Sequence, residues 1–155
     1  MAPILSISEA ASLGMHALAL LAGQQGRKLS AREMAAQLKV SGHHLAKVMQ
    51  RLARAGLVES VRGPHGGFKL ARRASSITLL SAYEALEGAL PPTQSCLLGK
   101  PACQGHCILG GLVHSMGAQV REYLAGTTLE GLGNGFAPDP RVVRDGPAGP
   151  NGATS

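Results

Sequence analysis

The segment GLVESVRGPHGGFKLAR, residues 56–72, constrains the fold of this chain more than any other part of it. Two short runs of strand-forming residues, 57–61 and 67–70, flank a turn over residues 62–66. The turn is rich in glycine, which adopts the positive φ angles that a tight hairpin connection requires. We therefore predict an antiparallel β-hairpin across this segment.

The residues before the hairpin predict three helices. The first covers residues 8–23 and is apolar around nearly its whole circumference, so we expect it to be buried. Ser30 and Glu33 have the spacing of a capping box, which starts a short second helix. Ser41 is the expected N-cap of a third helix over residues 42–55. The apolar face of this third helix repeats at steps of three and four and consists of Leu45, Val48, Met49 and Leu52.

The second and third helices, joined by a short turn, have the geometry of a helix-turn-helix. A recognition helix reads base edges from its N-terminal residues. The candidates here are Ser41, His43, His44 and Lys47. The candidates for phosphate contacts are Arg51, Arg54, Lys69, Arg72 and Arg73. For all of these side chains, a plain solvated surface is the alternative interpretation.

Basic charge is concentrated in the part of the chain that holds these elements. The net charge is +6 and the sequence pI is about 9.7. Residues 27–73 contain eleven Lys or Arg against two Glu, whereas the rest of the chain contains four basic and seven acidic residues. Segregated positive charge favours an anionic partner, such as the phosphates of double-stranded DNA.

The turn of the hairpin carries further candidate DNA contacts, namely Arg62, Pro64, His65 and Gly66. An Arg at the tip can enter a narrow minor groove, where the negative potential is enhanced. Proline and glycine let the turn approach the DNA backbone closely. An ordinary hairpin turn is the alternative, whereas a phosphate-binding P-loop is excluded because no Gly-Lys-Ser/Thr follows.

The C-terminal part divides into four predicted segments. Thr78 caps a helix that ends near residue 87, and a proline-containing loop follows over residues 90–107. A long helix then runs from about residue 107 to 125, with a last short turn that Thr127 is expected to cap. From residue 131 onward ten of twenty-five residues are Gly or Pro, so we expect 131–155 to be a disordered tail. The long helix has a coiled-coil-like apolar stripe of Leu109, Leu112, Met116, Val120 and Tyr123.

The three cysteines, Cys96, Cys103 and Cys107, fall in and at the end of the proline-containing loop. An odd number of cysteines without a signal peptide argues against a disulfide framework. Thiolates suit an iron–sulfur cluster or zinc, and free redox thiols are a third possibility. Three thiolates would leave one ligand position of a metal centre open.

The sequence predicts neither an enzyme nor a membrane protein. We find no paired carboxylates at useful spacing, no Ser-His-Asp arrangement in a strand–turn–helix context and no nucleotide-binding loop. The apolar N-terminal stretch is interrupted by Glu9 and His16 and has no charged region before it, which argues against a signal peptide. No apolar run reaches membrane-spanning length. We expect a cytoplasmic protein.

The chain resembles the winged-helix regulators that include the iron–sulfur regulator IscR, the nitric oxide sensor NsrR and the iron regulator RirA, the Rrf2 family. The resemblance covers roughly residues 6–132 and is most specific in AGLVESVRGPHGGFKLAR, 55–72, and SITLLSAYEALEG, 76–88. It implies a mainly α fold with a β-hairpin wing. The implied domains are a winged helix-turn-helix over 1–89, a cluster loop over 90–107 and a dimerisation helix with a last turn over 108–130.

The resemblance also implies a function, that of a homodimeric regulator, a repressor in the leading interpretation, that binds a partly palindromic operator. A [2Fe–2S] or [4Fe–4S] cluster on the cysteines would then sense iron, redox state or nitric oxide. In some relatives a carboxylate or His from the partner's first helix completes the site. The carboxylate position matches Ser12 here, and His16 matches the ligand His, although a buried core histidine is the alternative for His16.

Two other functions stay open at this point. The same DNA-binding regulator can carry a cluster-free thiol switch or a structural zinc site, or the chain can be a partner-binding module with weak DNA affinity. The recognition helix also departs from the iron–sulfur regulator, because His43, His44, Ala46 and Lys47 stand where that protein has Ser, Tyr, Glu and Gln. The departure predicts a different operator sequence.

Overall fold

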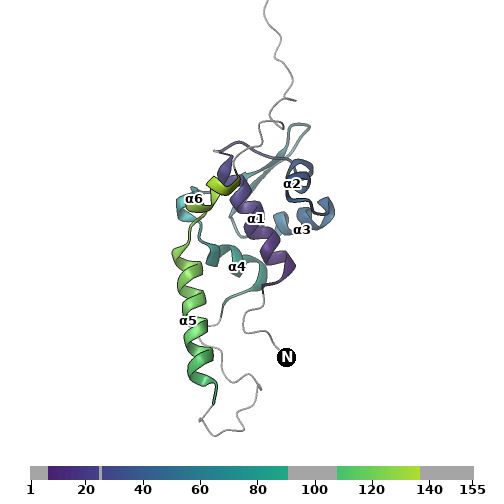
Figure 1. The fold of residues 1–155 in the computed structure, drawn as a ribbon. Helices are drawn as coiled ribbons and strands as arrows, with labels where there is room; N and C mark the ends of the chain where they lie inside the picture. Colours follow the sequence, from purple (N-terminus) through teal and green to yellow (C-terminus); the bar gives the residue numbers. More distant parts are fainter. Residues whose placement is uncertain (1–6, 25, 91–107, 137–155) are drawn as a thin grey trace, which may run out of the picture.

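The structure is a computed structural model that describes residues 7–24, 26–90 and 108–136 (Figure 1). Within these residues the fold is mainly α with one two-stranded hairpin, as predicted. The elements are α1 (Glu9–Gly23), α2 (Ala31–Leu38), α3 (Gly42–Arg54), β1 (Val58–Val61), β2 (Gly67–Leu70), the 3-10 helix η1 (Ala74–Ser76), α4 (Leu79–Glu87), α5 (Gly110–Gly126), α6 (Leu129–Leu132) and the 3-10 helix η2 (Gly133–Phe136).

Helix α1 lies at the centre of the fold and packs against α2, α3, α4, α6, η2 and β2 (Figure 1). Most of its side chains are buried, as its apolar composition predicted. Gly14 lets α3 and α4 approach closely, because an added Cβ would lie 2.2 Å from Leu86 Cδ1 and 3.3 Å from Val48 Cγ1. The helix that carries the predicted base-reading residues, α3, is therefore packed tightly against α1.

The helix-turn-helix is formed by α2 and α3, with the caps that the sequence predicted. The Ser30 N–H donates to Glu33 Oε2 at 2.7 Å, and the Glu33 N–H donates to Ser30 Oγ at 3.2 Å, which confirms the capping box. Lys39, at the C-terminal end of α2, turns the chain with a left-handed φ of 55°. Ser41 is the N-cap of α3. The predicted apolar face of α3 is buried at all four positions.

Replacement of Glu33 by Ala is expected to lower the free energy of unfolding by about 1 kcal/mol, because the capping hydrogen bonds of α2 are lost. The backbone N–H and hydroxyl of Ser30 donate to the carboxylate and lower the pKa of Glu33. Because the lowered pKa means that folding favours the ionised carboxylate, the part of the stabilisation that depends on this charge is fully present above the ordinary pKa of a glutamate. It is lost as the pH falls through the lowered pKa of the folded state.

The pH dependence separates the charge of Glu33 from the shape of its side chain. Glu33→Gln keeps an oxygen acceptor but carries no charge. Urea denaturation of the wild-type and Glu33→Gln proteins should therefore give different free energies of unfolding at neutral pH and equal values in acid. A difference that stays constant from neutral to acid pH would contradict this account.

The hairpin has the predicted position, with β1 paired antiparallel to β2 and Val58 opposite Leu70. A further contact was not predicted, since the segment before α2 pairs with β2. The Leu29 N–H donates to the Phe68 carbonyl at 3.0 Å, and the Phe68 N–H donates to the Leu29 carbonyl at 2.7 Å. Gly67 permits this pairing, because an added Cβ would lie 2.5 Å from the Leu29 carbonyl oxygen. Strand β2, close to the turn of the wing, is thereby attached to the segment that leads into the helix-turn-helix.

The C-terminal elements differ from the prediction in three ways. Helix α5 begins at Gly110, so the prediction that it includes residues 108–109 is wrong; these two residues form a turn. Thr128, and not Thr127, is the N-cap of α6, and its side chain makes no capping hydrogen bond. Residues 131–136 belong to α6 and η2 and not to a disordered tail. Residues 137–155, the rest of the predicted tail, lie outside the described residues.

Contacts with the rest of the fold explain why residues 127–136 are ordered. The Leu79 N–H donates to the Thr127 carbonyl at 2.9 Å, and the Leu129 N–H donates to the Ile77 carbonyl at 3.0 Å. Leu129 is fully buried, and η2 packs on the C-terminal end of α1. A composition rich in glycine therefore did not prevent order, because backbone pairing and one buried Leu hold the segment. Among the described residues, no helix has the length and hydropathy to cross a membrane.

Candidate DNA interface and cysteine segment

The N-terminal half of α3 presents the predicted base-reading residues at the surface. Ser41, His43 and Lys47 are exposed, and His44 is half-exposed. The amphipathic sequence of α3 produces this arrangement, because burial of its four apolar residues turns the polar face outward. The structure therefore brings all four residues together at one end of one helix.

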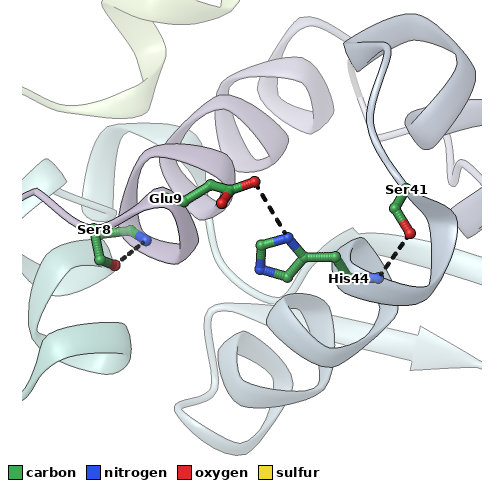
Figure 2. Close-up of polar contacts among 5 residues, drawn as sticks. Ser8, Glu9, Ser41 and His44 are labelled. Atoms are coloured by element: carbon green, nitrogen blue, oxygen red, sulfur yellow. Dashed lines mark hydrogen bonds and ion pairs between the residues drawn. The ribbon is translucent and has the colours of Figure 1, made fainter.

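The imidazole of His44 is only partly exposed to solvent and lies beside the carboxylate of Glu9 on α1 (Figure 2). The distance from His44 Nδ1 to Glu9 Oε1 is 3.6 Å, and the side chains are 37% and 86% exposed. In the sequence, Glu9 only interrupts the apolar N-terminal stretch and gives no sign of a partner. No local pattern links it to His44, since the contact arises from the packing of α1 on α3.

Arg51 and Lys69, two predicted phosphate contacts, already have partners within the protein. The guanidinium of Arg51 donates to the Leu86 carbonyl near the end of α4. Lys69 Nζ lies 3.3 Å from Glu59 Oε2 across the hairpin. DNA would have to compete with these interactions, whereas within the described residues no hydrogen bond or ion pair engages the side chains of Arg54, Arg72 and Arg73, which are exposed as Arg51 is. The packing thus divides the predicted phosphate contacts into two classes.

The wing tip carries its predicted residues in an accessible arrangement. Arg62, Pro64 and His65 are exposed. Gly66 is half-buried, and an added Cβ would lie 2.4 Å from the Val61 carbonyl oxygen, so this glycine closes the turn. Gly66 therefore has a structural reason to be glycine that does not depend on DNA.

The predicted ligands of a metal centre are only partly covered by the structure. Cys96, Cys103 and Cys107 lie outside the described residues. His16 is exposed on α1, so the interpretation as a buried core histidine is wrong. Its Nδ1 lies 2.7 Å from the carbonyl oxygen of Ser12. The carbonyl can only accept, so Nδ1 carries the proton and a neutral ring has its lone pair on Nε2.

The described residues do not form a metal site by themselves. Residues 7–24, 26–90 and 108–136 contain no group of three His, Cys, Asp or Glu side chains that could hold a metal ion. A centre would therefore need ligands from outside these residues, where the three cysteines lie, with His16 as a candidate fourth ligand. The chemistry of this donor set fits an iron–sulfur cluster or zinc, because thiolate and neutral imidazole bind both.

Helix α5 projects away from the body of the fold (Figure 1) and exposes large apolar side chains. Leu109, just before the helix, and Leu112 and Tyr123 within it are 44%, 52% and 64% exposed. Met116 and Val120 are half-buried, and Val120 packs against the core. The predicted apolar stripe is thus present, but Val120, in its C-terminal part, packs against the core of the same chain.

In comparisons with known proteins, this chain is similar to transcriptional regulators. The family model for Rrf2, described as an iron-dependent transcriptional regulator, matches residues 7–135. A candidate HTH-type transcriptional regulator of Aquifex aeolicus (strain VF5) is 34% identical over 131 residues, which are 82% of this chain and 90% of the relative. The family match extends from before α1 into η2, so it includes the helix-turn-helix, the wing and α5.

Solved structures with a similar fold include two regulators. CymR (YrzC), described as the global cysteine regulator of B. subtilis, has a TM-score of 0.70 and 30% sequence identity, covering 84% of this chain and 97% of that chain. IscR of T. potens has a TM-score of 0.65 and 25% identity, covering 84% of this chain and 88% of that chain. These similarities confirm the predicted fold class and the resemblance.

Proposed function

The chain belongs to the Rrf2 family of transcriptional regulators, and we propose that it acts as a homodimer that binds a partly palindromic DNA operator and regulates transcription in response to its cysteine centre. Its relatives are regulators and not enzymes. The observation that carries the DNA-binding part is the joint exposure of the N-terminal half of α3 and of Arg62 at the wing tip. Both belong to the strongly basic part of the chain.

In the proposed complex, α3 lies in the major groove and the wing reaches the adjacent minor groove. Ser41, His43 and Lys47 meet base edges, and the exposed Arg54, Arg72 and Arg73 meet phosphates. Binding then has a sequence-selective part and a salt-dependent part. The experiment that tests it is selection from a random duplex library with the full chain, followed by titration of the selected duplex at several salt concentrations.

Selective binding with an affinity that falls steeply with salt would support the proposal. Each phosphate contact is expected to contribute about 0.9 to the slope of log affinity against log salt. Weak binding without sequence preference would instead favour a partner-binding module. That outcome would leave the family assignment intact and refute the operator-binding role.

The proposed dimer uses the apolar side chains of α5. Leu112→Asp is expected to convert a dimer into a monomer and to weaken operator binding at least tenfold, because a charge would be buried against the partner and the two half-sites would no longer be bound together. Sedimentation equilibrium and gel-shift titration measure the two effects. Ala118→Asp adds the same charge at an exposed position on the other side of α5 and should leave the dimer unchanged. A Leu112→Asp protein that stays dimeric would contradict this interface.

We propose that the cysteine centre is an iron–sulfur cluster held by Cys96, Cys103, Cys107 and His16. Support comes from the iron-dependent description of the family, the similarity to IscR, and the Nδ1–H of His16, which gives Nε2 the lone pair that a ligand needs. A cluster of this kind supplies iron and sulfide that react with oxygen or nitric oxide. Its loss would change operator affinity through the helix that carries His16.

The proposed fourth ligand comes from the partner chain. Within one chain, α5 begins at the end of the molecule remote from α6, away from the centre of α1 where His16 lies (Figure 1). The cysteine nearest to α5 in sequence, Cys107, precedes this start by only a few residues. Donation of His16 by the partner would therefore couple the cluster to the geometry of the dimer.

The similarity to CymR supports a second candidate function. CymR is described as a global cysteine regulator, and its structure has a higher TM-score to this chain than that of IscR. The second candidate keeps DNA binding but makes the cysteines redox-active thiols or ligands of structural zinc. Metal and sulfide analysis distinguishes the two candidates.

A further inference from the structure

The N-terminal ends of α1 and α3 lie side by side in the fold (Figure 2). Ser8 caps α1 by accepting the Ala11 N–H at 3.1 Å, and its hydroxyl donates to Glu87 on α4. The start of α1 is thereby held in place. Glu9, the first residue of the helix, extends from this anchored end to the imidazole of His44, 3.6 Å away on α3.

Glu9 differs from the other acidic residues around the proposed DNA-binding face. The carboxylate of Glu33 accepts the Ser30 N–H in the capping box, and Glu59 lies 3.3 Å from Lys69. Glu9 alone among these three contacts a residue of the recognition helix. A carboxylate near DNA repels phosphates and weakens binding to every sequence alike. Glu9 lies in the first turn of α1, where its charge also stabilises the helix, so any benefit of Glu9 to DNA binding itself must lie in selectivity rather than in affinity.

The chemistry of the pair determines what His44 can offer to a base. A carboxylate is negatively charged and cannot donate, so Glu9, 3.6 Å from His44 Nδ1, favours the tautomer in which this nearer nitrogen carries the proton. In a neutral imidazole Nε2 is then an acceptor. In the major groove, an acceptor pairs with the amino group of adenine or cytosine and not with the O6 of guanine or the O4 of thymine.

We propose that Glu9 is a positioning residue for base recognition, holding the His44 ring as a hydrogen-bond acceptor that selects an adenine or a cytosine at one position of each half-site. The inference rests on the proposed function, since it requires α3 to lie in the major groove. It adds a specificity-determining residue that belongs to α1 and not to the helix-turn-helix.

The test compares base preferences rather than overall affinity. Random duplex libraries are selected with the full-length wild-type, Glu9→Gln, His44→Ala and doubly substituted proteins at a pH of about 8, where an ordinary imidazole is neutral. The Gln amide can donate to Nδ1, so Glu9→Gln permits the tautomer with the proton on Nε2. At the position read by His44, the preference for adenine or cytosine should fall about tenfold, the scale of one base contact.

Glu59→Gln is the matched control, because it removes the same charge from the same basic region without touching α3. It is expected to change the affinity for all duplexes equally. His44→Ala should abolish the preference at the same position that Glu9→Gln alters. In the His44→Ala background, Glu9→Gln should have no further effect at that position, since paired residues act non-additively.

The outcomes separate this inference from the proposed function. If His44→Ala changes a base preference and Glu9→Gln changes only affinity, the positioning role of Glu9 is refuted while DNA recognition by α3 stands. If neither substitution alters any preference, Glu9 has nothing to position, and the inference fails although the operator is still bound. If the wild-type protein selects no sequence, the proposed function fails as well.

Discussion

Arg62→Ala is expected to weaken operator binding by roughly 10- to 100-fold, the scale of a lost Arg contact in a DNA groove. Arg62 is exposed at the hairpin turn, between β1 and β2, and no described acidic side chain pairs with it. Its charge is therefore available to the strong negative potential of a narrow minor groove. Gel-shift titration at one fixed salt concentration measures the loss.

Folding of the Arg62→Ala protein should be unaffected, because the backbone hydrogen bonds that hold the wing do not involve the Arg62 side chain. Leu29 and Phe68 exchange two backbone hydrogen bonds, and β1 pairs with β2 from Val58 opposite Leu70 to Val61 opposite Gly67. The melting temperature is therefore expected to match that of the wild type. Arg73→Ala removes an exposed charge outside the wing and should cause a smaller loss that is uniform over all sequences. Equal affinity of the Arg62→Ala and wild-type proteins would refute minor-groove insertion.

If the proposed iron–sulfur cluster is present, Cys103→Ser is expected to remove it, so that protein purified without oxygen loses its iron, its acid-labile sulfide and its visible absorption. A serine hydroxyl is a poor ligand for iron because it stays protonated and is harder than a thiolate. His16→Ala should have a milder effect, leaving the three thiolates in place. Iron and sulfide analysis with the visible spectrum measures both variants against the wild type.

The wild-type protein supplies the control for this prediction. Matched iron and sulfide would establish the cluster, and its loss on substitution of Cys103 would identify a ligand. Colourless wild-type protein with zinc, or without metal, would refute the cluster and favour the structural zinc site or the thiol switch. Equal iron content in the Cys103→Ser and wild-type proteins would remove Cys103 from the ligand set.

The helices and the hairpin could be predicted because their signals are local. Ser30 and Glu33 stand three residues apart and form one hydrogen-bonded unit, so the start of α2 follows from the sequence alone. The exposed face of α3 follows from the spacing of its apolar residues. Resemblance to a known family added the order of the domains, which stays a prediction.

The predictions that are wrong concern residues whose structure depends on contacts with segments far away in the sequence. Residues 131–136 have the composition of a disordered tail, yet the Leu79–Thr127 and Leu129–Ile77 hydrogen bonds hold the preceding residues against the core. Thr127 was predicted as a cap from its neighbours in sequence. The backbone pairing with α4 and η1 sets that end of the chain instead. Composition describes a segment in isolation and carries no information about partners elsewhere.

The sequence alone predicts the fold class, the basic segment that is proposed to bind DNA and the candidate ligands, since periodicity, capping and charge are properties of contiguous residues. Only the tertiary structure decided how those residues are engaged. It placed His44 beside Glu9, attached Arg51 to the carbonyl of Leu86 and left Arg62 exposed. The physical reason is that helix packing brings together side chains far apart in the sequence, and their polar contacts form only once α1, α3 and α4 are packed.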